Sequence, residues 1–202
     1  FDRADLGFRK EITDVQYVAA MNPTAGSFVI CERAQRHFAT FCCAMPSEAD
    51  LVTTYSAIFS GHLQGFSASV TGAAEKIVQA TVNLHNAVSR RFLPSAIKFT
   101  YNWNMRELTN IFQGLTLSDP EYFDKSVQMC RLWVHECNRV FADRLVTTAE
   151  IEVFDGMLQE VAKKELPDGP DVVLSTPVPF TNFASQSKGC YVEVESTETL
   201  KR

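Results

Sequence analysis

Two short apolar runs stand near the beginning of the chain, and each is followed closely by a proline. They are residues 15–21, before Pro23, and residues 38–44, before Pro46. Continuous apolar runs of this length, bounded by turn signals, are typical of strands buried on both faces of a parallel sheet. The pattern therefore predicts two buried strands. Because two strands do not make a stable sheet alone, we expect the rest of the sheet to come from polypeptide upstream of Phe1.

From Ser47 onward the apolar residues recur every three or four positions, which is the period of a helix with one buried face. Ser47 followed by Asp50 is a typical helix start, and Pro120 after Ser118-Asp119 suits the first turn of another helix. The expected helices cover a short turn at 33–37, then 47 to about 64, about 70–92 and 120–144. Asn104 or Met105 starts a further helix that runs to 115, and Thr147 or Thr148 caps a last helix that runs to about 166. The pattern therefore predicts a helical bundle over residues 47–166.

The last part of the chain, residues 167–202, differs in composition from the helical part. Prolines and glycines punctuate its first half, and its end is polar apart from one β-like patch at residues 191–194. Clusters of such residues mark turns and loops. We therefore expect a loop-rich connector after the helical bundle.

The composition is that of an ordinary globular protein, with 46% hydrophobic and 21% charged residues and a net charge of -5. No basic run exceeds two residues, which argues against a nucleic-acid partner. No apolar stretch reaches the ~18 residues that a membrane span needs. The cysteines sit in apolar segments, so we expect reduced thiols rather than disulfides. Cys130 and Cys137 share one expected helix face, and we expect these two to pack in the core rather than to hold a metal.

Asn22 follows directly after the first expected strand, and Arg36 precedes the second. Ligands of α/β folds bind outside the carboxyl ends of strands. An amide at that position can orient the water that attacks a γ-phosphate, and a guanidinium at the domain edge can pair with phosphate oxygens. Taken alone, Asn22 would be an ordinary turn residue and Arg36 an ordinary surface residue.

Three longer motifs carry a resemblance to a known family. They are MNPTAGSF at 21–28 with QRHF at 35–38, FLPSAIKFTYNWNMRELTNIFQGL at 92–115, and RLWVHE at 131–136 with RVF at 139–141. Over roughly residues 1–185 the chain resembles the AAA+ core, and within it the third AAA+ module of an axonemal dynein heavy chain.

The resemblance implies a fold class and a division of the chain. The fold would be α/β, with part of an AAA+ (P-loop NTPase) large subdomain that contributes the two buried strands, followed by an all-α helical lid. Residues 1–46 would form the end of the large subdomain, residues 47–166 the lid, and residues 167–202 a linker toward the next module.

The resemblance also implies roles for individual residues. Asn22 matches the first sensor, which responds to the γ-phosphate of the module's own nucleotide. Arg36 matches the arginine finger that reaches the nucleotide of the preceding module, with Arg33, one helical turn away, as the alternative. Arg106 matches the second sensor, which lies in the lid and contacts phosphates when the lid closes.

The parts of a P-loop ATPase that hold the nucleotide most firmly are absent from this sequence. It contains no GxxxxGK[ST] motif and no apolar strand ending in Asp-Glu. In the family these elements come before the region that corresponds to the beginning of this chain at Phe1. We therefore expect ATP or ADP with Mg²⁺ in the intact module, but no tight binding and no hydrolysis by this chain alone.

The function implied by the resemblance is a regulatory part of an ATP-driven microtubule motor in the cytoplasm, at the cytoskeleton of a ciliary or flagellar axoneme. Its expected partners are neighbouring AAA+ modules of the same heavy chain and, through the parent, microtubules and dynein intermediate and light chains, with no nucleic acid and no membrane. Two alternatives remain. The chain could be a structural spacer with idle sensors, or a helical interaction module unrelated to nucleotides.

Overall fold

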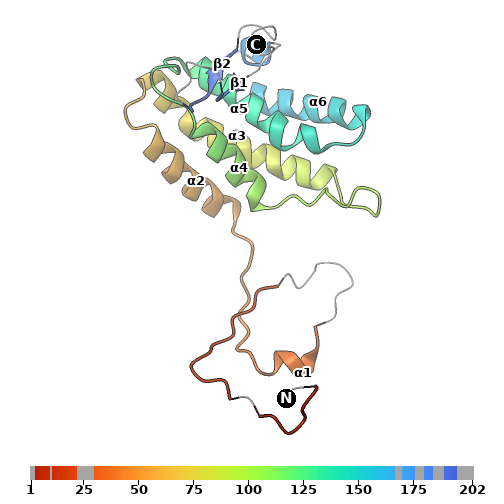
Figure 1. Ribbon diagram of the computed structural model, residues 1–202. Helices are drawn as coiled ribbons and strands as arrows, with labels where there is room; N and C mark the ends of the chain where they lie inside the picture. Colours follow the sequence, from red (N-terminus) through yellow and green to blue (C-terminus); the bar gives the residue numbers. More distant parts are fainter. Residues whose placement is uncertain are drawn as a thin grey trace. The chain divides into compact units, whose positions relative to one another are not determined.

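The chain divides into two units, residues 1–44 and 45–202, and each is described by itself (Figure 1). The computed structural model describes residues 3–9, 11–21, 30–166, 170–175, 180–183 and 189–194. Asn22, the expected first sensor, lies outside the described residues. Asn22 therefore keeps the role that the motif at 21–28 suggests, as a prediction.

The first unit contains one short helix, α1 (Glu32–Gln35), where a helical turn was expected. The two expected strands at 15–21 and 38–44 are extended but unpaired, and their apolar side chains are exposed: Val18 is 90% exposed and Phe41 86%. This corrects the expectation of two buried strands for this chain taken by itself. A parallel strand is stabilised by neighbouring strands and covering helices, and the described residues of this unit supply neither.

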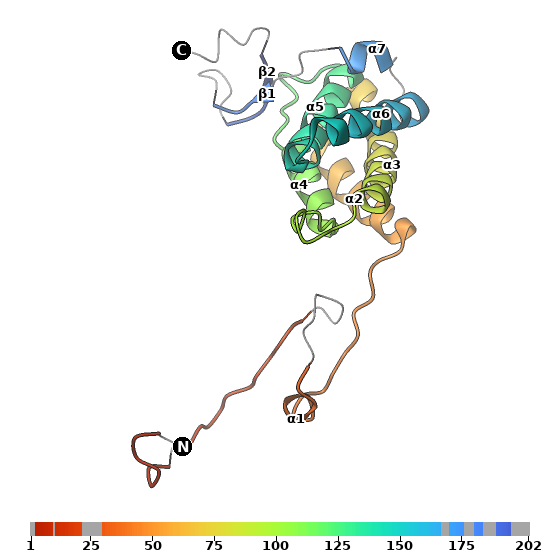
Figure 2. The ribbon, with the colours of Figure 1, turned by 90° about the vertical axis from the view of Figure 1, so that its right-hand side faces the viewer.

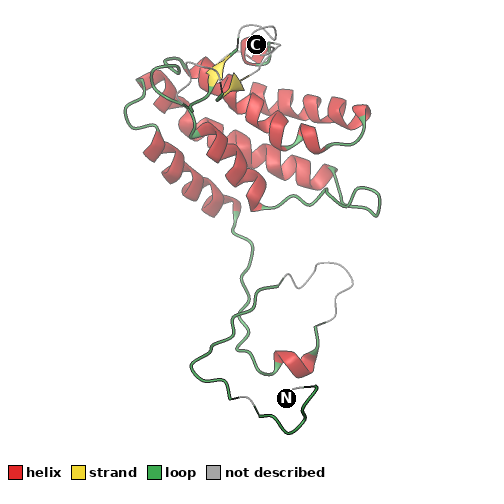
Figure 3. Cartoon of the chain, in the orientation of Figure 1, coloured by secondary structure: helices red, strands yellow, loops and turns green. Residues whose placement is uncertain are grey.

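The second unit is a bundle of helices (Figure 3). Its elements are α2 (Glu48–His62), α3 (Ala68–Arg91), α4 (Met105–Leu115), α5 (Ser126–Val140), the 3₁₀ turn η1 (Ala142–Arg144) and α6 (Thr148–Glu165). The longest helix, α3, packs against α2, α4, α5 and α6. It is therefore the central element, and its residues Ile77, Val78 and Leu84 are fully buried.

Side-chain caps fix where the helices begin. The hydroxyl of Ser47 accepts a hydrogen bond from the backbone N of Asp50, and the Asp50 carboxylate accepts from the backbone N of Ser47. Thr147 caps α6 by accepting from the backbone N of Glu150. Each such cap stabilises a helix by about 1 kcal/mol. The predicted start at Ser47 is confirmed, and of the two predicted caps of α6, Thr147 and Thr148, the structure shows Thr147.

The helix expected over 120–144 begins later, at Ser126. Pro120 instead lies in a single turn. In this turn the Asp119 carbonyl accepts hydrogen bonds from the backbone N–H groups of Tyr122 and Phe123. The Gln128 side chain then accepts from the next two backbone N–H groups at 3.0 Å each, which starts α5 afresh. Pro120 thus marks a turn rather than the start of a helix.

The interior of the bundle is apolar, with few polar exceptions. Cys130 and Cys137 are fully buried, which confirms that they pack in the core. The indole Nε1 of Trp133 donates to Thr81 Oγ1 at 2.9 Å, and the Thr81 hydroxyl donates to the Ile77 carbonyl at 2.6 Å. The buried indole of α5 and the buried hydroxyl of α3 therefore each have a hydrogen-bond partner.

Described parts of the connector lie on the bundle. They are α7 (Pro170–Val173) and two short antiparallel strands, β1 (Phe180–Thr181) and β2 (Val192–Glu193), which lie at one end of the bundle (Figure 2). The β-like patch expected at 191–194 thus includes β2. Val173 is fully buried and Phe180 nearly so. Among the helices that the structure describes, none is both long and apolar enough to cross a bilayer.

Candidate functional site

Arg106 stands at the beginning of α4, directly after the N-cap residue Asn104 and Met105. Its side chain is exposed, and within the described ranges its guanidinium pairs with no carboxylate. Its backbone, by contrast, is fixed, because the Arg106 N–H donates to the Asn104 side-chain oxygen at 2.8 Å. The structure thus presents a free cation from a rigid helix start.

A capping box holds this helix start. The Glu107 carboxylate turns back and accepts from the Asn104 backbone N at 2.7 Å, while the Asn104 side chain caps the helix from the other side. The Asn104 carbonyl accepts in turn from His85 Nε2 of α3 at 3.2 Å. The pKa of His85 is lowered, chiefly by burial, so the neutral ring is favoured. Contacts from α3 thus add to the local cap.

Glu107 is nearly buried, and its second oxygen accepts from the guanidinium of Arg144 at 2.8 Å. Arg144 lies in η1, 37 residues further along the chain. Its guanidinium also lies over the ring of Trp103, 4.9 Å from the centroid, at cation–π distance. The buried carboxylate is therefore neutralised by a partner from another element.

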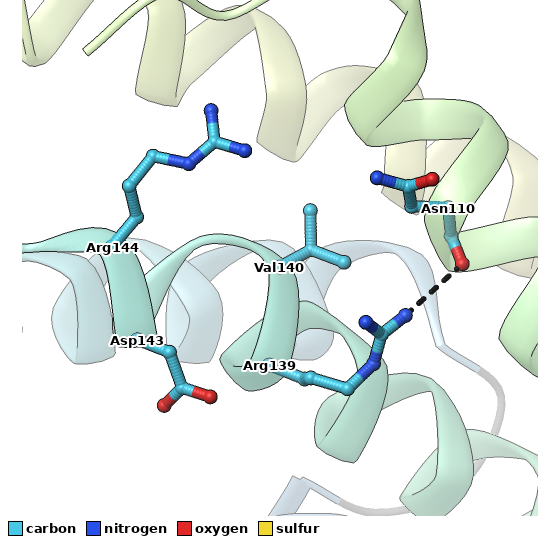
Figure 4. A pocket seen from close by; sticks show the side chains of 5 residues that line it. All are labelled: Asn110, Arg139, Val140, Asp143 and Arg144. Carbon is cyan, nitrogen blue, oxygen red and sulfur yellow. Dashed lines mark hydrogen bonds between the residues drawn. The ribbon is translucent and has the colours of Figure 1, made fainter. Parts of the chain in front are cut away.

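A shallow hollow of about 290 Å³ opens on the same side of the bundle. It is lined by Asn110, Arg139, Val140, Asp143 and Arg144 (Figure 4). Figure 4 shows the guanidinium of Arg139 donating to the Asn110 carbonyl, at 3.3 Å. Asn110 lies four residues after Arg106 on α4 and so on the same helix face. The exposed guanidinium and the hollow thus share one face of α4.

A second polar cluster joins α4, α5 and the connector. Glu136 of α5 is fully buried, and its Oε2 accepts from both Nε and Nη2 of Arg139, at 3.0 and 2.6 Å. The hydrogen bond with Glu136 raises the pKa of Arg139. Burial, and next the neighbouring Glu136, raises the pKa of Tyr191 in the connector to about 12. The buried carboxylate of this pair thus acts on Tyr191 of the connector, while Arg139 is exposed.

Arg131, five residues before Glu136 on α5, holds two parts of the connector at once. Its Nη1 donates to the carbonyls of Val172 and Ser175, at 3.1 and 2.9 Å, and its Nε donates to Glu193 at 2.8 Å. The ring of His135 lies against the rings of Phe180 and Tyr191, with centroids 5.5 and 5.7 Å apart. The polar residues of the RLWVHE motif therefore bind the described connector to α5.

Arg33 and Arg36, the two candidates for the arginine finger, belong to the first unit. Arg33 lies within α1, and Arg36 follows it directly. Both are exposed, and Arg36 Nε donates to His37 Nε2 at 3.3 Å. Arg106 belongs to the second unit. The expected roles of Arg33, Arg36 and Arg106 stay predictions.

Sequence reasoning missed Arg144, Glu107 and Glu136. Asn104 followed three residues later by Glu107 is a readable capping signal, and it could have identified the buried carboxylate. The pairing of Glu107 with Arg144 has no local signal, because the two are far apart in sequence. Within the described ranges no group of three or more histidine, cysteine, aspartate or glutamate side chains is arranged to hold a metal ion.

Family models match both parts of the chain. A model described as "P-loop containing dynein motor region" matches residues 1–46, and a model described as "AAA+ lid domain" matches residues 77–176. The helical bundle from residue 77 onward thus matches an AAA+ lid, and residues 1–46 match a dynein motor region.

Curated relatives extend the match over most of the chain. The flagellar outer-arm dynein beta chain of Chlamydomonas reinhardtii is 44% identical over 180 residues, the ciliary dynein beta chain of Tripneustes gratilla 45% over 172, and human dynein axonemal heavy chain 9 39% over 207. These matches cover 88%, 83% and 99% of this chain, but only 4% of each relative. The chain therefore belongs to the axonemal dynein heavy chain family and spans a small part of such a protein's length.

Proposed function

We propose that this chain is the C-terminal part of the third AAA+ module of an axonemal dynein heavy chain. Residues 1–46 are the end of the large subdomain, residues 47–166 the lid, and residues 167–202 lead toward the next module. The parent is an ATP-driven microtubule motor of the ciliary or flagellar axoneme. This module senses nucleotide state and passes the motion of its lid around the ring.

The exposed guanidinium of Arg106 carries this proposal. It has no carboxylate partner within the described ranges, and its backbone is held by the cap of α4. A preorganised, unpaired arginine suits phosphate oxygens, because its planar fork stays charged and pairs with two oxygens at once. We assign Arg106 the second-sensor role, in contact with the phosphates of ATP or ADP when the lid closes.

The other proposed contacts come from the first unit. Asn22 acts as the first sensor and orients the attacking water, and Arg36 acts as the finger toward the preceding module, with Arg33 as the alternative. These assignments rest on the motifs at residues 21–28 and 35–38. The phosphate loop and the Mg²⁺-binding acidic strand are supplied by other parts of the heavy chain, since this sequence has no GxxxxGK[ST] motif.

The clamp between α5 and the connector supports the second half of the proposal. Arg131 ties Val172 and Glu193 to α5, so the described connector moves with the bundle. A rotation of the lid would therefore displace the start of the following polypeptide. The neighbouring AAA+ modules of the same heavy chain are the direct partners, and microtubules and the intermediate and light chains are partners of the parent.

The test uses the intact dynein ring that contains this chain. Arg106→Ala is compared with Arg91→Ala, an exposed arginine at the end of α3. Loss of one charged contact to phosphate is expected to weaken nucleotide binding at this module by about tenfold or more, and to change nucleotide-dependent release from microtubules. Arg91→Ala is expected to change neither.

The alternatives give different results. If the third site of the unaltered ring binds no nucleotide, the chain is a structural spacer with idle sensors. If the site binds nucleotide and Arg106→Ala leaves both affinity and motility unchanged, the sensing role of the lid is wrong. Arg36→Ala and Arg33→Ala identify the finger, because the correct one slows ATP turnover at the preceding module.

A further inference from the structure

The start of α4 is held by groups from three other elements as well as by its own cap. His85 of α3 binds the Asn104 carbonyl, Tyr55 of α2 donates to the Met105 carbonyl at 3.3 Å, and Arg144 of η1 binds Glu107. The backbone around Arg106 is therefore part of the packed bundle, although the Arg106 side chain is in solvent.

Arg144 differs from the other holding groups because it carries charge. Glu107 is only 4% exposed, and its two oxygens are used, one by the Asn104 N–H and one by Arg144. Taking Arg144 away would leave an ionised carboxylate without its counter-charge in a buried place, which is costly. The carboxylate would then gain by turning toward another cation.

Arg106 is the nearest such cation in sequence, directly before Glu107. In the structure it forms no ion pair with any described residue, while Glu107 is paired with Arg144. The Arg144 guanidinium is fixed on Glu107 from two further directions, by the Trp103 ring and by the Asn102 carbonyl at 3.4 Å. Its position therefore keeps the carboxylate in the buried pair with Arg144, while the Arg106 side chain lies in solvent.

We propose that Arg144 is a positioning residue for Arg106: by binding Glu107, it holds the start of α4 in place and keeps the Arg106 guanidinium free for an anionic ligand. This inference rests on the proposed sensing function and names a residue that controls it. Arg144 does not touch the ligand. It acts by removing a competing carboxylate.

The experiment measures nucleotide affinity at this module in the intact ring, for Arg144→Gln, Arg106→Ala and the two combined. Arg144→Gln is expected to weaken affinity by about five- to tenfold, since Glu107 then competes for Arg106. In the Arg106→Ala background the same change is expected to have no further effect. Arg91→Gln, which removes an equal charge from an exposed site, is expected to leave affinity unchanged.

A rescue tests whether the charge of Glu107 causes the loss of affinity. Glutamine also serves at the third position of a capping box, so Glu107→Gln in the Arg144→Gln background keeps the cap and removes the competing charge. This pair is expected to restore affinity to within about twofold of the unaltered ring. Because Glu107→Gln also removes the unpaired buried charge, the free energy of unfolding is measured beside affinity. A purely structural role would show a destabilised Arg144→Gln ring that loses affinity in the Arg106→Ala background as well.

Two results would overturn the inference while leaving the proposed function intact. They are an unchanged affinity in Arg144→Gln, and an equal further loss when that change is added to Arg106→Ala. If Arg106→Ala itself has no effect, the sensing function fails first and the inference fails with it. Should Arg144→Gln not fold, Arg144→Lys replaces it, with an expected loss of about two- to fivefold, and no loss would overturn the inference.

Discussion

The carboxylate of Glu136 on α5 lies directly against the backbone of Gly114 on α4. A Cβ atom at position 114 would overlap that carboxylate, so the two helices approach each other at this point only because residue 114 has no side chain. At this approach Glu136 is fully buried and pairs with the exposed Arg139.

Gly114→Ala is therefore expected to destabilise the bundle, although alanine favours helices more than glycine does. The overlap should lower the free energy of unfolding by about 1–3 kcal/mol. Gly156→Ala is the matched control, because nothing lies within 4 Å of a Cβ at that position in α6. It should raise the free energy of unfolding by up to about 1 kcal/mol. Urea unfolding of both variants checks the opposite signs, and two stabilised variants would contradict this view of the contact.

Thr81→Val is expected to leave the Trp133 indole N–H buried without its acceptor. The free energy of unfolding should fall by about 1–3 kcal/mol, because an unsatisfied buried donor costs its full desolvation. Thr53→Val removes the hydroxyl of an exposed threonine that donates to the Ala49 carbonyl, and should change stability by less than about 0.5 kcal/mol. Equal effects in the two variants, measured by thermal or urea unfolding, would show that the indole bond contributes nothing.

Glu150 should make the bundle sensitive to acid. Chiefly because Lys98 Nζ donates to it at 2.6 Å, with Tyr101 and Thr147 adding hydrogen bonds, its pKa falls from 4.5 to about 2. Since the folded-state pKa lies below the unfolded one, the stabilisation is fully present above pH ~4.5 and is lost as the pH falls through ~2.

The difference in unfolding free energy between the unaltered chain and Glu150→Gln should therefore be largest at neutral pH and shrink between pH ~4.5 and ~2. Denaturant unfolding at several pH values measures this difference. Glu160→Gln, at an exposed position of the same helix, should show no such trend. A difference that is constant with pH would mean that the Lys98 contact does not act on Glu150 in solution.

Arg131→Gln is expected to release the described connector from α5. Hydrogen exchange at residues 170–175 and 189–194 should become about tenfold faster or more, while exchange in α3 stays slow. Lys163→Gln, on the exposed face of α6, should leave both regions unchanged. If the connector exchanges at the same rate in Arg131→Gln, the aromatic contacts of His135 hold it without help from the guanidinium.

Local signals in the sequence account for most of the lid. Ser47 and Thr147 cap the helices that they were expected to start, because an N-cap needs only residues within one turn. Residues 15–21 and 38–44 do not form the predicted strands in the structure. A strand needs partner segments to pair with, and a local sequence pattern does not show whether such segments are present. The late start of α5 was missed because Pro120 suits a turn as well as a helix.

The candidate site divides in the same way. The position of Arg106 at a helix start followed from the chain pattern, and its exposure agrees with the proposed contact to a ligand. The partner of Glu107 could not be predicted, because 37 residues and a change of element separate it from Arg144. Long-range ion pairs depend on how helices pack against each other. The periodicity of one helix does not show which of its residues will meet which residues of another element.

The docking of the connector determines where the lid can be shortened. Val173 and Phe180 are buried against the bundle, and the Tyr191 backbone donates to the Leu117 carbonyl at 2.9 Å. A truncation after Leu166 would expose the apolar surface around Phe123 that Phe180 covers, and would remove the ion pair of Arg131 with Glu193. A recombinant lid that is to stay soluble and monomeric should therefore extend at least to Val194.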